Sequence, residues 1–434
     1  MNRKIRVLYL LTFIVITGFL IVIILHMLFQ KKEQKQQYAE SKLPSENHLP
    51  DAEHPIIRVV LKTGSFLGIT HSEVKVSAAG GLRVYSSETV REYRAGEELC
   101  VKPDHEMFAQ GTIWIEPKNE RDKITISSYK RGCGVPSYRG KMELFSTAEG
   151  IVIVNELPVD EYLCGVVPSE MPSSYEKEAL KCQAVCARSY AYCQMQSFAY
   201  PEYSAHVDDS TSYQVYGNSG EQETTNEAVN DTRGQKVWFQ NQVVKTYYYS
   251  TSCGKSTSVE AWGTSLGKHN QYLCGVDVCN EEGVAYEKEL PWYKWKAVIP
   301  EKCLSNLIEL NTEKEIGTLR NIKVTKIGAG GCVLQIVAEG SEGSVTVETE
   351  NKIRTALGGS GYKIEKQDGT KQDSTRLLPS AFFSIAKNDG SYIIEGGGYG
   401  HGIGMSQNGA NEMAKTGKTY EEILMFFYPG TKVE

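Results

Sequence analysis

Short apolar runs separated by glycine, asparagine and serine fill the chain from Ile56 to about Val154. The clearest runs are IIRVVLKTG, EVKVSAAGGLRVYSS, KITISSY and GIVIVNELP, all rich in valine and isoleucine. This pattern predicts a succession of short β-strands. From Pro158 to Phe198 the apolar period becomes helical, and the predicted apolar stripe consists of Ala179, Cys182, Val185, Cys186 and Tyr190.

Strand patterns return in the second half of the chain, in GQKVWFQNQVVKTYYYSTSCG, where FQNQV predicts a hairpin turn, and in RNIKVTKIGAGGCVLQIVAEGSEGSVTVET. Near the C-terminus one helix is predicted to end at Gly417 and another to begin at Thr419, with Glu422 completing a capping box. Ser173 and Glu176 predict a similar box ahead of the central helix. Because strands and helices are segregated, we expect an α+β fold with mostly antiparallel strands.

The N-terminal apolar run predicts a membrane anchor. Val7–Phe29 contains 23 residues without a formal charge, enough to cross a hydrocarbon core of about 30 Å. The run ends in bulky residues and lysines rather than a small-residue cleavage site, so we expect a retained transmembrane helix. The predicted organisation is a short tail (1–6), a transmembrane anchor (7–29), a polar tether (30–55) and a single functional region (56–434).

Charge and cysteine content narrow the class of protein. The chain has a formal net charge of −6, and its first 35 residues carry six basic residues and one acidic residue, which leaves about −11 for the remainder. An acidic body argues against nucleic-acid binding. The eleven cysteines include no C-x-x-C pair, which excludes a dense disulfide scaffold and a zinc-finger pattern. The sequence alone does not decide whether Cys274 and Cys279 form a local disulfide.

Glu170 stands between two prolines in VVPSEMP, directly ahead of the central helix. Because Pro168 and Pro172 restrict the backbone around them, we expect a stiff, non-helical connector that delivers Glu170 just before a helix starting near Ser174. A general acid needs such positioning. A helix N-terminus would favour the ionised carboxylate, so burial must raise its pKa. The alternative is an exposed glutamate in a proline-rich turn.

A second candidate segment is EGGGYGHGIGMSQNGA, residues 395–410, where six glycines fall within nine residues. It lacks the lysine of a phosphate-binding loop and has no metal-ligand spacing around His401. A glycine-rich wall beside a long polymer fits this composition, with His401, Ser406 and Gln407 as hydrogen-bonding groups. A tightly packed structural turn is the alternative.

Two other residues have open roles at this point. Arg188 in the central helix could hold a substrate carboxylate or orient Glu170, or it could pair with an acid for structural reasons. Cys253 in STSCGKSTS is a candidate nucleophile, since Lys255 could lower the pKa of its thiol.

Several long motifs in one order resemble the stage II sporulation protein D family of lytic transglycosylases. The motifs, from about Ile56 to Thr431, include YRGKMELF, GIVIVNELPVDEYLCGVVPSEMP, EALKCQAVCARSYA, TRGQKV, YYYSTSCGKSTSVEAWG, IRTALG and GGGYGHGIGMSQNGANEMAKTGKTYEEILMFFYPGT. The resemblance implies that Glu170 is the catalytic acid/base in a helix-lined glycan groove, with Arg188 close to it. It also implies cleavage of peptidoglycan strands, stripped of stem peptides by an amidase, to 1,6-anhydro-N-acetylmuramoyl ends.

The resemblance further implies a location and partners. We expect a single-pass membrane protein whose functional region lies outside the cytoplasm, between mother-cell and forespore membranes during engulfment. It would work there beside a partner amidase and other anchored proteins. Related amidase enhancers indicate an alternative function, that of a non-catalytic glycan-binding module that stimulates an amidase.

The resemblance also leads us to expect substrate-binding roles for Ser169, Gln214 and Tyr216. Some family members hold zinc through cysteines and histidines just before a Q-x-Y segment. The matching stretch AHVDDSTSYQVYG offers only His206, Asp208 and Asp209 as ligands, whereas structural zinc normally takes four nitrogen or sulfur ligands. We therefore expect no zinc and no other cofactor.

Overall fold

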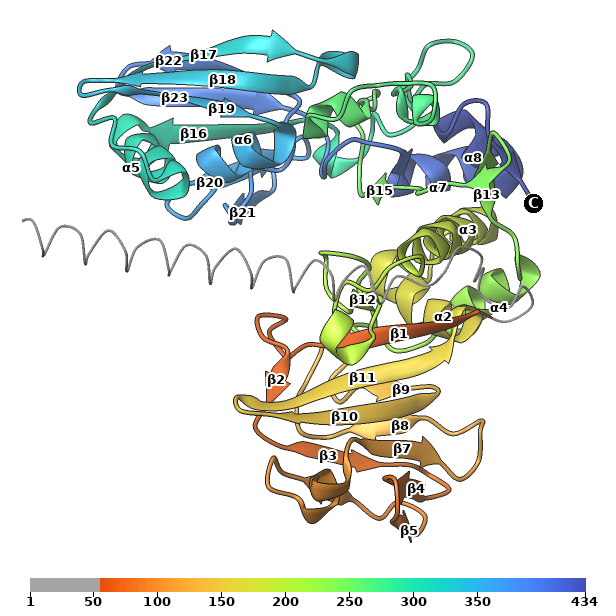
Figure 1. The fold of residues 1–434 in the computed structure, drawn as a ribbon. Helices are drawn as coiled ribbons and strands as arrows, with labels where there is room; N and C mark the ends of the chain where they lie inside the picture. The colour runs from red at the N-terminus through yellow and green to blue at the C-terminus, as the bar shows by residue number, and fades with distance from the viewer. Residues whose placement is uncertain (1–54) are drawn as a thin grey trace, which may run out of the picture. The chain divides into compact units, whose positions relative to one another are not determined.

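The computed structural model describes residues 55–434 (Figure 1). Most strands of residues 56–158, together with β12, form a large and mainly antiparallel sheet. Its spatial order is β12-β1-β11-β10-β7-β4-β5, and β2 adds to β11. Its strands are β1 (Ile56–Leu61), β2 (Thr70–His71), β4 (Leu82–Tyr85), β5 (Val90–Glu92), β7 (Ile113–Pro117), β10 (Lys141–Thr147), β11 (Gly150–Pro158) and β12 (Val207–Asp208). Only the pairing of β1 with β12 is parallel within this sheet.

Burial of apolar side chains explains why these segments form a sheet. Ile57, Val59 and Leu61 of β1 point into the core with no exposed surface, and Leu144 of β10 lies opposite Ile153 of β11. A second, smaller antiparallel sheet packs on the same core. It consists of β6 (Leu99–Val101), β3 (Val74–Ser77), β8 (Ile124–Ile126) and β9 (Ser137–Tyr138). The strands predicted before residue 158 are therefore confirmed.

Three helices follow the first sheet: α2 (Val159–Glu170), α3 (Lys177–Gln194) and α4 (Glu223–Asp231). The predicted apolar stripe of α3 is buried as expected. The predicted capping box is wrong, because α3 begins at Lys177 and Glu176 is its N-cap without a side-chain capping bond. A turn closed by the Tyr175 N–H and the Pro172 carbonyl delays the helix, and Asn411 accepts a hydrogen bond from the Glu176 N–H at 2.9 Å.

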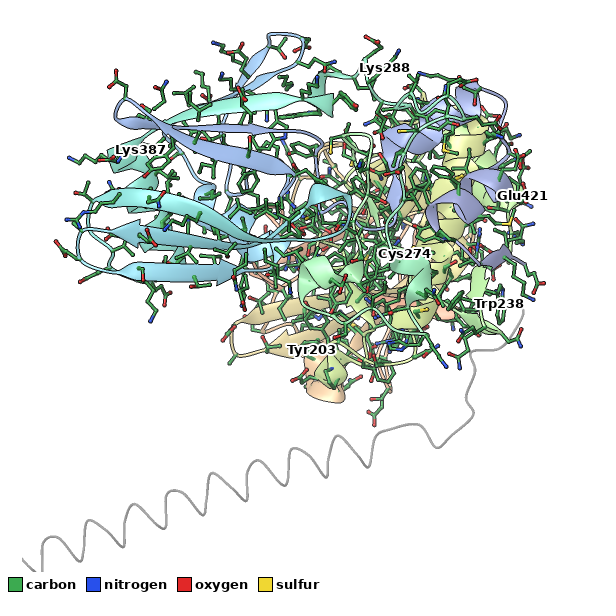
Figure 2. The ribbon with its side chains drawn as sticks, turned by 90° about the horizontal axis from the view of Figure 1, so that it is seen from above. Tyr203, Trp238, Cys274, Lys288, Lys387 and Glu421 are labelled. Atoms are coloured by element: carbon green, nitrogen blue, oxygen red, sulfur yellow. The ribbon has the colours of Figure 1, made fainter. Side chains whose placement is uncertain are left out.

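A second core holds residues 291–396 together. Its five-stranded antiparallel sheet has the order β21-β20-β16-β23-β22, and a three-stranded sheet has the order β17-β18-β19. The strands are β16 (Trp295–Pro300), β17 (Leu319–Ile327), β18 (Val333–Gly340), β19 (Ser344–Glu348), β20 (Lys363–Lys366), β21 (Lys371–Asp373), β22 (Phe383–Asn388) and β23 (Ser391–Gly396), joined by α5 (Glu301–Thr312) and α6 (Glu350–Leu357). Lys387 on β22 points outward, as does Lys288 ahead of this region (Figure 2).

The segment that leads into the second core lies beside the segment that returns from it. Strand β15 (Tyr248–Tyr249) pairs in parallel with β24 (Met405–Ser406), with Tyr248 opposite Met405. The short α7 (Gln407–Lys415) and α8 (Tyr420–Phe427) then pack against α3. The predicted capping box of Thr419 and Glu422 is confirmed at the start of α8. The return therefore brings residues near 401–407 next to residues near 248.

The remaining strands complete a mostly antiparallel α+β fold, as predicted. Strand β13 (Val237–Phe239) pairs with β14 (Gln242–Val243) and with β25 (Lys432–Val433). Gln240 and Asn241 both have positive φ, as the predicted hairpin turn requires. The expected membrane anchor at 7–29 lies outside the described residues. Within residues 55–434, every helix is too short or too polar to cross a bilayer.

Candidate active site

Glu170 is the last residue of α2, which corrects the predicted non-helical connector. Pro168 lies inside the helix, and the turn continues past it because the Met171 N–H donates to the Val167 carbonyl at 2.9 Å. The side chain therefore sits at a helix C-terminus rather than ahead of an N-terminus. The helix dipole there disfavours the ionised carboxylate, so its sign is opposite to the one expected from the sequence.

Burial makes the Glu170 carboxyl group a proton carrier near neutral pH. Its desolvation raises the pKa from 4.5 to about 7, although hydrogen bonds from the Val215 N–H and from Tyr248 work in the opposite direction. The Val215 N–H lies 2.7 Å from Oε1 of Glu170. Gln407 fixes the backbone of the same residue, since its Nε2 donates to the Glu170 carbonyl oxygen at 3.0 Å.

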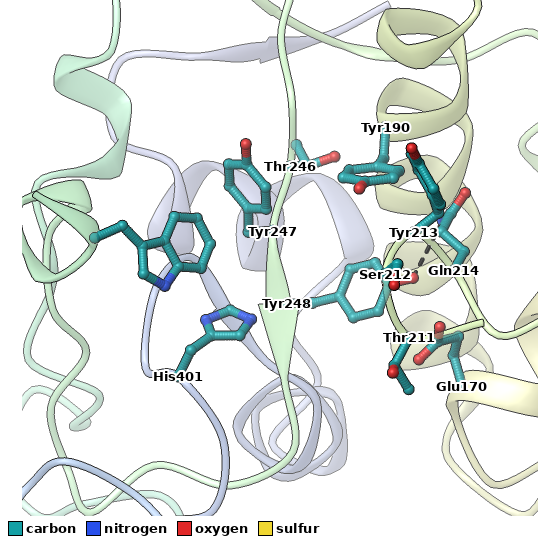
Figure 3. Close-up of a pocket in the computed structure, with 11 residues that line it drawn as sticks. Glu170, Tyr190, Thr211, Ser212, Tyr213, Gln214, Thr246, Tyr247, Tyr248 and His401 are labelled. Atoms are coloured by element: carbon teal, nitrogen blue, oxygen red, sulfur yellow. Dashed lines mark hydrogen bonds between the residues drawn. The ribbon is translucent and has the colours of Figure 1, made fainter. Parts of the chain in front are cut away.

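Two adjoining cavities meet at Glu170. The first, of about 340 Å³, is lined by Glu170, Tyr190, Thr211, Ser212, Tyr213, Gln214, Thr246, Tyr247, Tyr248, Trp262 and His401 (Figure 3). The second, of about 590 Å³, shares six of these residues and extends to Glu350, Asn351, Arg354, Arg376, Tyr399 and Gln407. We call the two together the cleft. Aromatic side chains from both cavities, including Tyr248 and Trp262, form part of its lining.

The cleft contains one carboxyl group that has no cationic partner. Among the lining residues the only other carboxylate is Glu350, which accepts hydrogen bonds from Trp262 Nε1 at 3.1 Å and from Arg354 at 3.3 Å. Glu350 is buried and held in this pair. Glu170 is consequently the single group of the cleft lining suited to donate and recover a proton.

His401 lies in the cleft as an uncharged ring. Burial lowers its pKa to about 3, and the nearby Arg354 guanidinium acts in the same direction. Its Nδ1 accepts a hydrogen bond from the Ile403 N–H at 3.1 Å, which places the proton on Nε2. Glu170 and His401 lie on opposite sides of Tyr248 in Figure 3. His401 thus belongs to the cleft wall and is not a charged group.

The structure brings some of the predicted site residues to Glu170. Gln214 and His401 line the first cavity, and Gln407 lines the second. Gln214 Nε2 donates to the Tyr248 hydroxyl at 3.1 Å. Ser406 lies beneath the surface, where it caps α7 by accepting from the Gly409 N–H and donates to Glu287 at 2.8 Å. The glycine-rich segment therefore serves both predicted alternatives, a cleft wall and a packed turn.

Arg188 corrects an expectation. Its side chain is 3 % exposed, and Nε donates to Asp160 at 2.8 Å. The terminal nitrogens donate to main-chain carbonyls of Val229 and Gln235 at 3.1 Å each. All of these partners lie away from the cleft lining, so Arg188 joins α3 to α2 and α4 instead of orienting Glu170. The structural alternative considered for this residue is the one observed.

Ser169 and Tyr216 also lie outside the cleft lining. The Ser169 hydroxyl donates to the Gly165 carbonyl at 2.7 Å and accepts from the N–H groups of Asn218 and Ser219. The Tyr216 hydroxyl donates to Asn155, and its ring covers Gly165 so closely that a Cβ there would lie 2.5 Å from the ring. Both residues fix the loop that runs beside Glu170.

Sequence reasoning missed several residues that the structure places beside Glu170. Tyr248, Trp262, Thr211 and Ser212 line both cavities. The repeated tyrosines of YYYSTSCG were a signal for an aromatic wall, and all three line the cleft: Tyr247 lines the first cavity, Tyr249 the second, and Tyr248 both. The pairing of β15 with β24 sets Tyr248 opposite Met405, close to His401 of the cleft lining.

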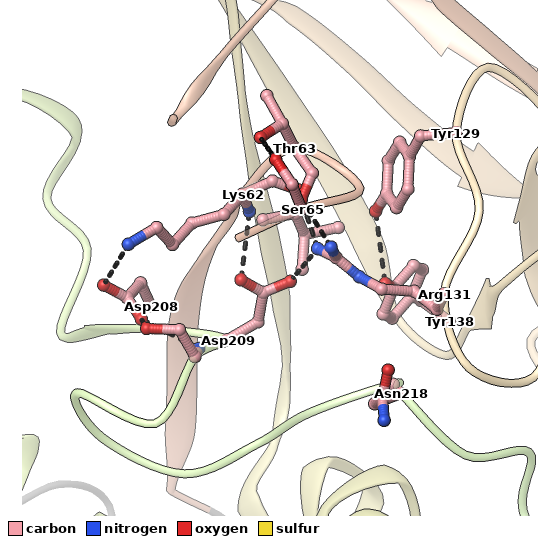
Figure 4. A network of polar contacts seen from close by, with 12 residues as sticks. Lys62, Thr63, Ser65, Tyr129, Arg131, Tyr138, Asp208, Asp209 and Asn218 are labelled. Carbon is pink, nitrogen blue, oxygen red and sulfur yellow. Dashed lines mark hydrogen bonds and ion pairs between the residues drawn. The ribbon is translucent and has the colours of Figure 1, made fainter. Parts of the chain in front are cut away.

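The stretch considered for zinc is held by protein contacts (Figure 4). Asp209 pairs with Arg131, both with fully buried side chains, and it accepts from the Lys62 N–H at 3.0 Å. His206 accepts from the Arg58 N–H, and Asp208 accepts from Ser210. Within residues 55–434 no group of three histidine, cysteine, aspartate or glutamate side chains is arranged to hold a metal ion.

The cysteines give no support to a thiol mechanism. Burial raises the pKa of the Cys253 thiol to about 11, which outweighs the small opposite effect of Lys255. A thiolate is the reactive form, so this residue is a poor nucleophile at neutral pH. Cys274 and Cys279 are free thiols, as are the other nine cysteines.

Comparisons with known proteins show which family this region of the chain resembles. Residues 147–239, which contain Glu170 and Gln214, match the family described as Stage II sporulation protein. Residues 277–404 match a domain family of unknown function, DUF8618. An uncharacterised protein of Brachyspira hyodysenteriae is 31 % identical over 304 residues, which cover 68 % of this chain and 72 % of that protein.

Two relatives from Bacillus subtilis carry descriptive names. Stage II sporulation protein D is 29 % identical over 332 residues, 72 % of this chain and 85 % of that protein. The amidase enhancer is 28 % identical over 292 residues, 62 % of this chain and 40 % of that protein. The chain belongs to the stage II sporulation protein D family.

Proposed function

We propose that this protein is a peptidoglycan lytic transglycosylase and that Glu170 is its acid and base. The observation that carries the proposal is the lone Glu170 carboxyl group, whose pKa of about 7 allows it to be protonated and ionised at neutral pH. A group with this pKa can both give and take a proton during one catalytic cycle. The aromatic walls on either side supply surfaces for sugar rings.

The reaction needs no second carboxylate. Protonated Glu170 gives its proton to the glycosidic oxygen, and the bond between that oxygen and C1 of N-acetylmuramic acid breaks. The 6-hydroxyl oxygen of the same sugar then bonds to C1, and its proton passes to the Glu170 carboxylate. The products are a 1,6-anhydro end and a new hydroxyl end, and the enzyme returns to its starting state. A hydrolase would normally place a second carboxylate about 5–10 Å away.

Mass spectrometry of digested peptidoglycan tests this proposal. The full-length chain is incubated with strands stripped of stem peptides, beside Glu170→Gln and the control Glu202→Gln. Glu202 is an exposed glutamate outside the cleft. Anhydro ends from the parent and the control, with at least a hundredfold loss in Glu170→Gln, are expected for a general acid. Reducing ends, or unchanged cleavage by Glu170→Gln, would contradict the proposal.

A second candidate function is a non-catalytic one. The relative named amidase enhancer shares 28 % identity over 292 residues, so the same cleft could bind glycan and stimulate a partner amidase without cutting. This candidate predicts that strands stay intact with either protein, and that an added N-acetylmuramoyl-L-alanine amidase works faster with parent and Glu170→Gln alike.

The proposed setting follows from the family and the N-terminal apolar run. We infer attachment to the cell membrane through residues 7–29, with the cleft outside the cytoplasm, where peptidoglycan is found. In a sporulating cell this would be the space between the mother-cell and forespore membranes. A partner amidase would supply the stripped strands, and other anchored engulfment proteins would share the space.

A further inference from the structure

The two arms of the cleft differ in charge. The arm formed by the first cavity is lined by aromatic and uncharged polar side chains; Glu170 is its only carboxyl group, and its lining contains no lysine or arginine. The arm formed by the second cavity adds two arginines, Arg354 and Arg376. A neutral sugar chain gives no reason for such a difference, so the cationic arm calls for an anionic group on the ligand.

Arg354 is a fixed part of this arm. It lies on α6, and only 7 % of the residue is exposed. Its Nε donates to the Leu378 carbonyl at 2.8 Å, and its Nη1 donates to Glu350 at 3.3 Å. Glu350 is in turn held by Trp262, which lines both cavities. Among the described residues, no acceptor pairs with Nη2 of Arg354. The charge of Arg354 is offset by Glu350, while one of its donor groups is left unused.

Arg376 supplies the charge that remains uncompensated. Its side chain is exposed, and within residues 55–434 no carboxylate lies at ion-pair distance from it. Its backbone, by contrast, is held on both sides. The Gly359 N–H donates to the Thr375 carbonyl at 2.7 Å, and the Leu378 N–H donates to the Arg354 carbonyl at 3.0 Å. The guanidinium is thus presented at the cleft from a fixed loop.

We propose that Arg376, with Arg354 beside it, forms a subsite for a carboxylate carried by the glycan. This inference rests on the proposed function and extends it. The carboxylate in question is the lactyl group of N-acetylmuramic acid, which is free only when the stem peptide has been removed. With the peptide attached, the same carbonyl is an uncharged amide. A guanidinium matches a carboxylate with two parallel hydrogen bonds but gains much less from an amide. The subsite therefore selects strands that an amidase has already processed.

A binding measurement separates this subsite from catalysis. The parent is the full-length Glu170→Gln protein, which binds strands without turnover under the proposed function. Its Kd is measured for stripped strands with free lactyl carboxylates and for the same strands after conversion of those groups to methylamides. We expect about tenfold tighter binding of the free carboxylate, a typical contribution of one charge-assisted pair. The difference should shrink at high salt.

Adding Arg376→Gln to this parent should abolish the difference between the two ligands and leave the methylamide Kd unchanged. The matched control is Arg320→Gln, which removes an exposed arginine of β17 that lies outside the cleft lining. It should keep the tenfold preference. Arg376→Lys should fall between them, because a lysine keeps the charge but not the planar fork.

The outcomes distinguish the two proposals. A persistent preference in Arg376→Gln, or equal Kd values for both ligands in the parent, would overturn the subsite. If the protein with Glu170 intact forms no anhydro ends but the tenfold preference is present, the proposed cleavage fails and the subsite stands. If anhydro ends form and the preference is absent, the subsite alone fails.

Discussion

Gln407 and Glu170 are 237 positions apart in the chain and are joined by a hydrogen bond of 3.0 Å from the Gln407 side chain to the Glu170 main-chain carbonyl. Gln407 also donates to Gln183 on α3 at 3.1 Å. One amide group therefore ties the end of α2, the middle of α3 and the start of α7. The main chain that carries the Glu170 side chain is therefore held in place. The Gln407 hydrogen bond is to the main-chain carbonyl and not to the carboxyl group.

Gln407→Ala should weaken catalysis more than substrate binding. Loss of the hydrogen bond frees the last turn of α2, and small displacements of a catalytic group are costly, so we expect kcat to fall by about ten- to hundredfold with KM changed much less. Steady-state kinetics on stripped strands measure this. Gln242→Ala, at an exposed position in β14, is the control. A rise in KM with unchanged kcat would show that Gln407 binds substrate instead.

The pKa of Glu170 predicts how activity depends on pH. Its acid form is needed for the first proton transfer, and burial raises its pKa to about 7, so kcat/KM should fall about tenfold per unit above pH 7. A profile of rate against pH checks this. An alkaline limb that stays flat to pH 9 would remove Glu170 from the role of acid.

The same pKa shift predicts a stability effect with a definite sign. Because the folded pKa is higher than the ordinary 4.5, the contribution of Glu170 to stability is complete below about pH 4.5 and is lost as the pH rises through about 7. Glu170→Gln, which cannot ionise, should therefore match the parent at pH 4. At pH 8 it should be more stable by up to about 3 kcal/mol. Urea unfolding at the two pH values measures the difference, and equal stability at both would contradict a buried, shifted carboxyl group.

The class of fold could be predicted from the sequence because the patterns that indicate it are local. The β-branched apolar runs of β1 and β11, the hairpin at Gln240 and Asn241 and the capping box of Thr419 depend on neighbours a few positions away. The prolines around Glu170 also singled it out as a candidate, and the structure places it in the cleft lining. Its position in the helix was not predicted, because the Met171 bond to Val167 outweighs the local preference of residues that precede proline.

The site itself depended on contacts that span the chain. Arg188 had the right chemistry for a substrate carboxylate, yet Asp160 and two main-chain carbonyls occupy its donors. Trp262 and Tyr248 became cleft residues only when β24 returned beside β15. Neither pattern nor composition could give these pairings, since they join segments that lie far apart in the sequence.

Arg188→Gln should reduce stability and leave the affinity for glycan nearly unchanged. The substitution leaves buried carbonyls of α4 and the following turn without donors and Asp160 without its buried partner, so we expect a loss of about 2–4 kcal/mol. Chemical unfolding gives the first quantity, and glycan binding by the folded fraction gives the second. A large loss of affinity with normal stability would return Arg188 to the role expected from the resemblance.

The pair of Arg131 and Asp209 should be a major support of the loop that carries Thr211, Ser212 and Gln214. Both side chains are fully buried, and Arg131 also donates to the carbonyls of Lys62 and Thr63. Arg131→Met would leave the Asp209 carboxyl group buried without its cation, and breaking such a pair costs about 3–5 kcal/mol. Arg131→Met combined with Asp209→Leu should recover part of the loss, because no charge is then left unpaired.

Lys363→Met is the matched control, since it breaks the pair of Lys363 with Asp373, whose side chains are 60 % and 86 % exposed. Exposed pairs of this kind contribute little, so its melting temperature should equal that of the parent. The loss in Arg131→Met should also lower glycan affinity, because the loop it holds lines the cleft. If Arg131→Met melted like the parent, the loop would be held by its other contacts, such as those of Asp208 and Tyr216, and the buried pair would be an incidental contact.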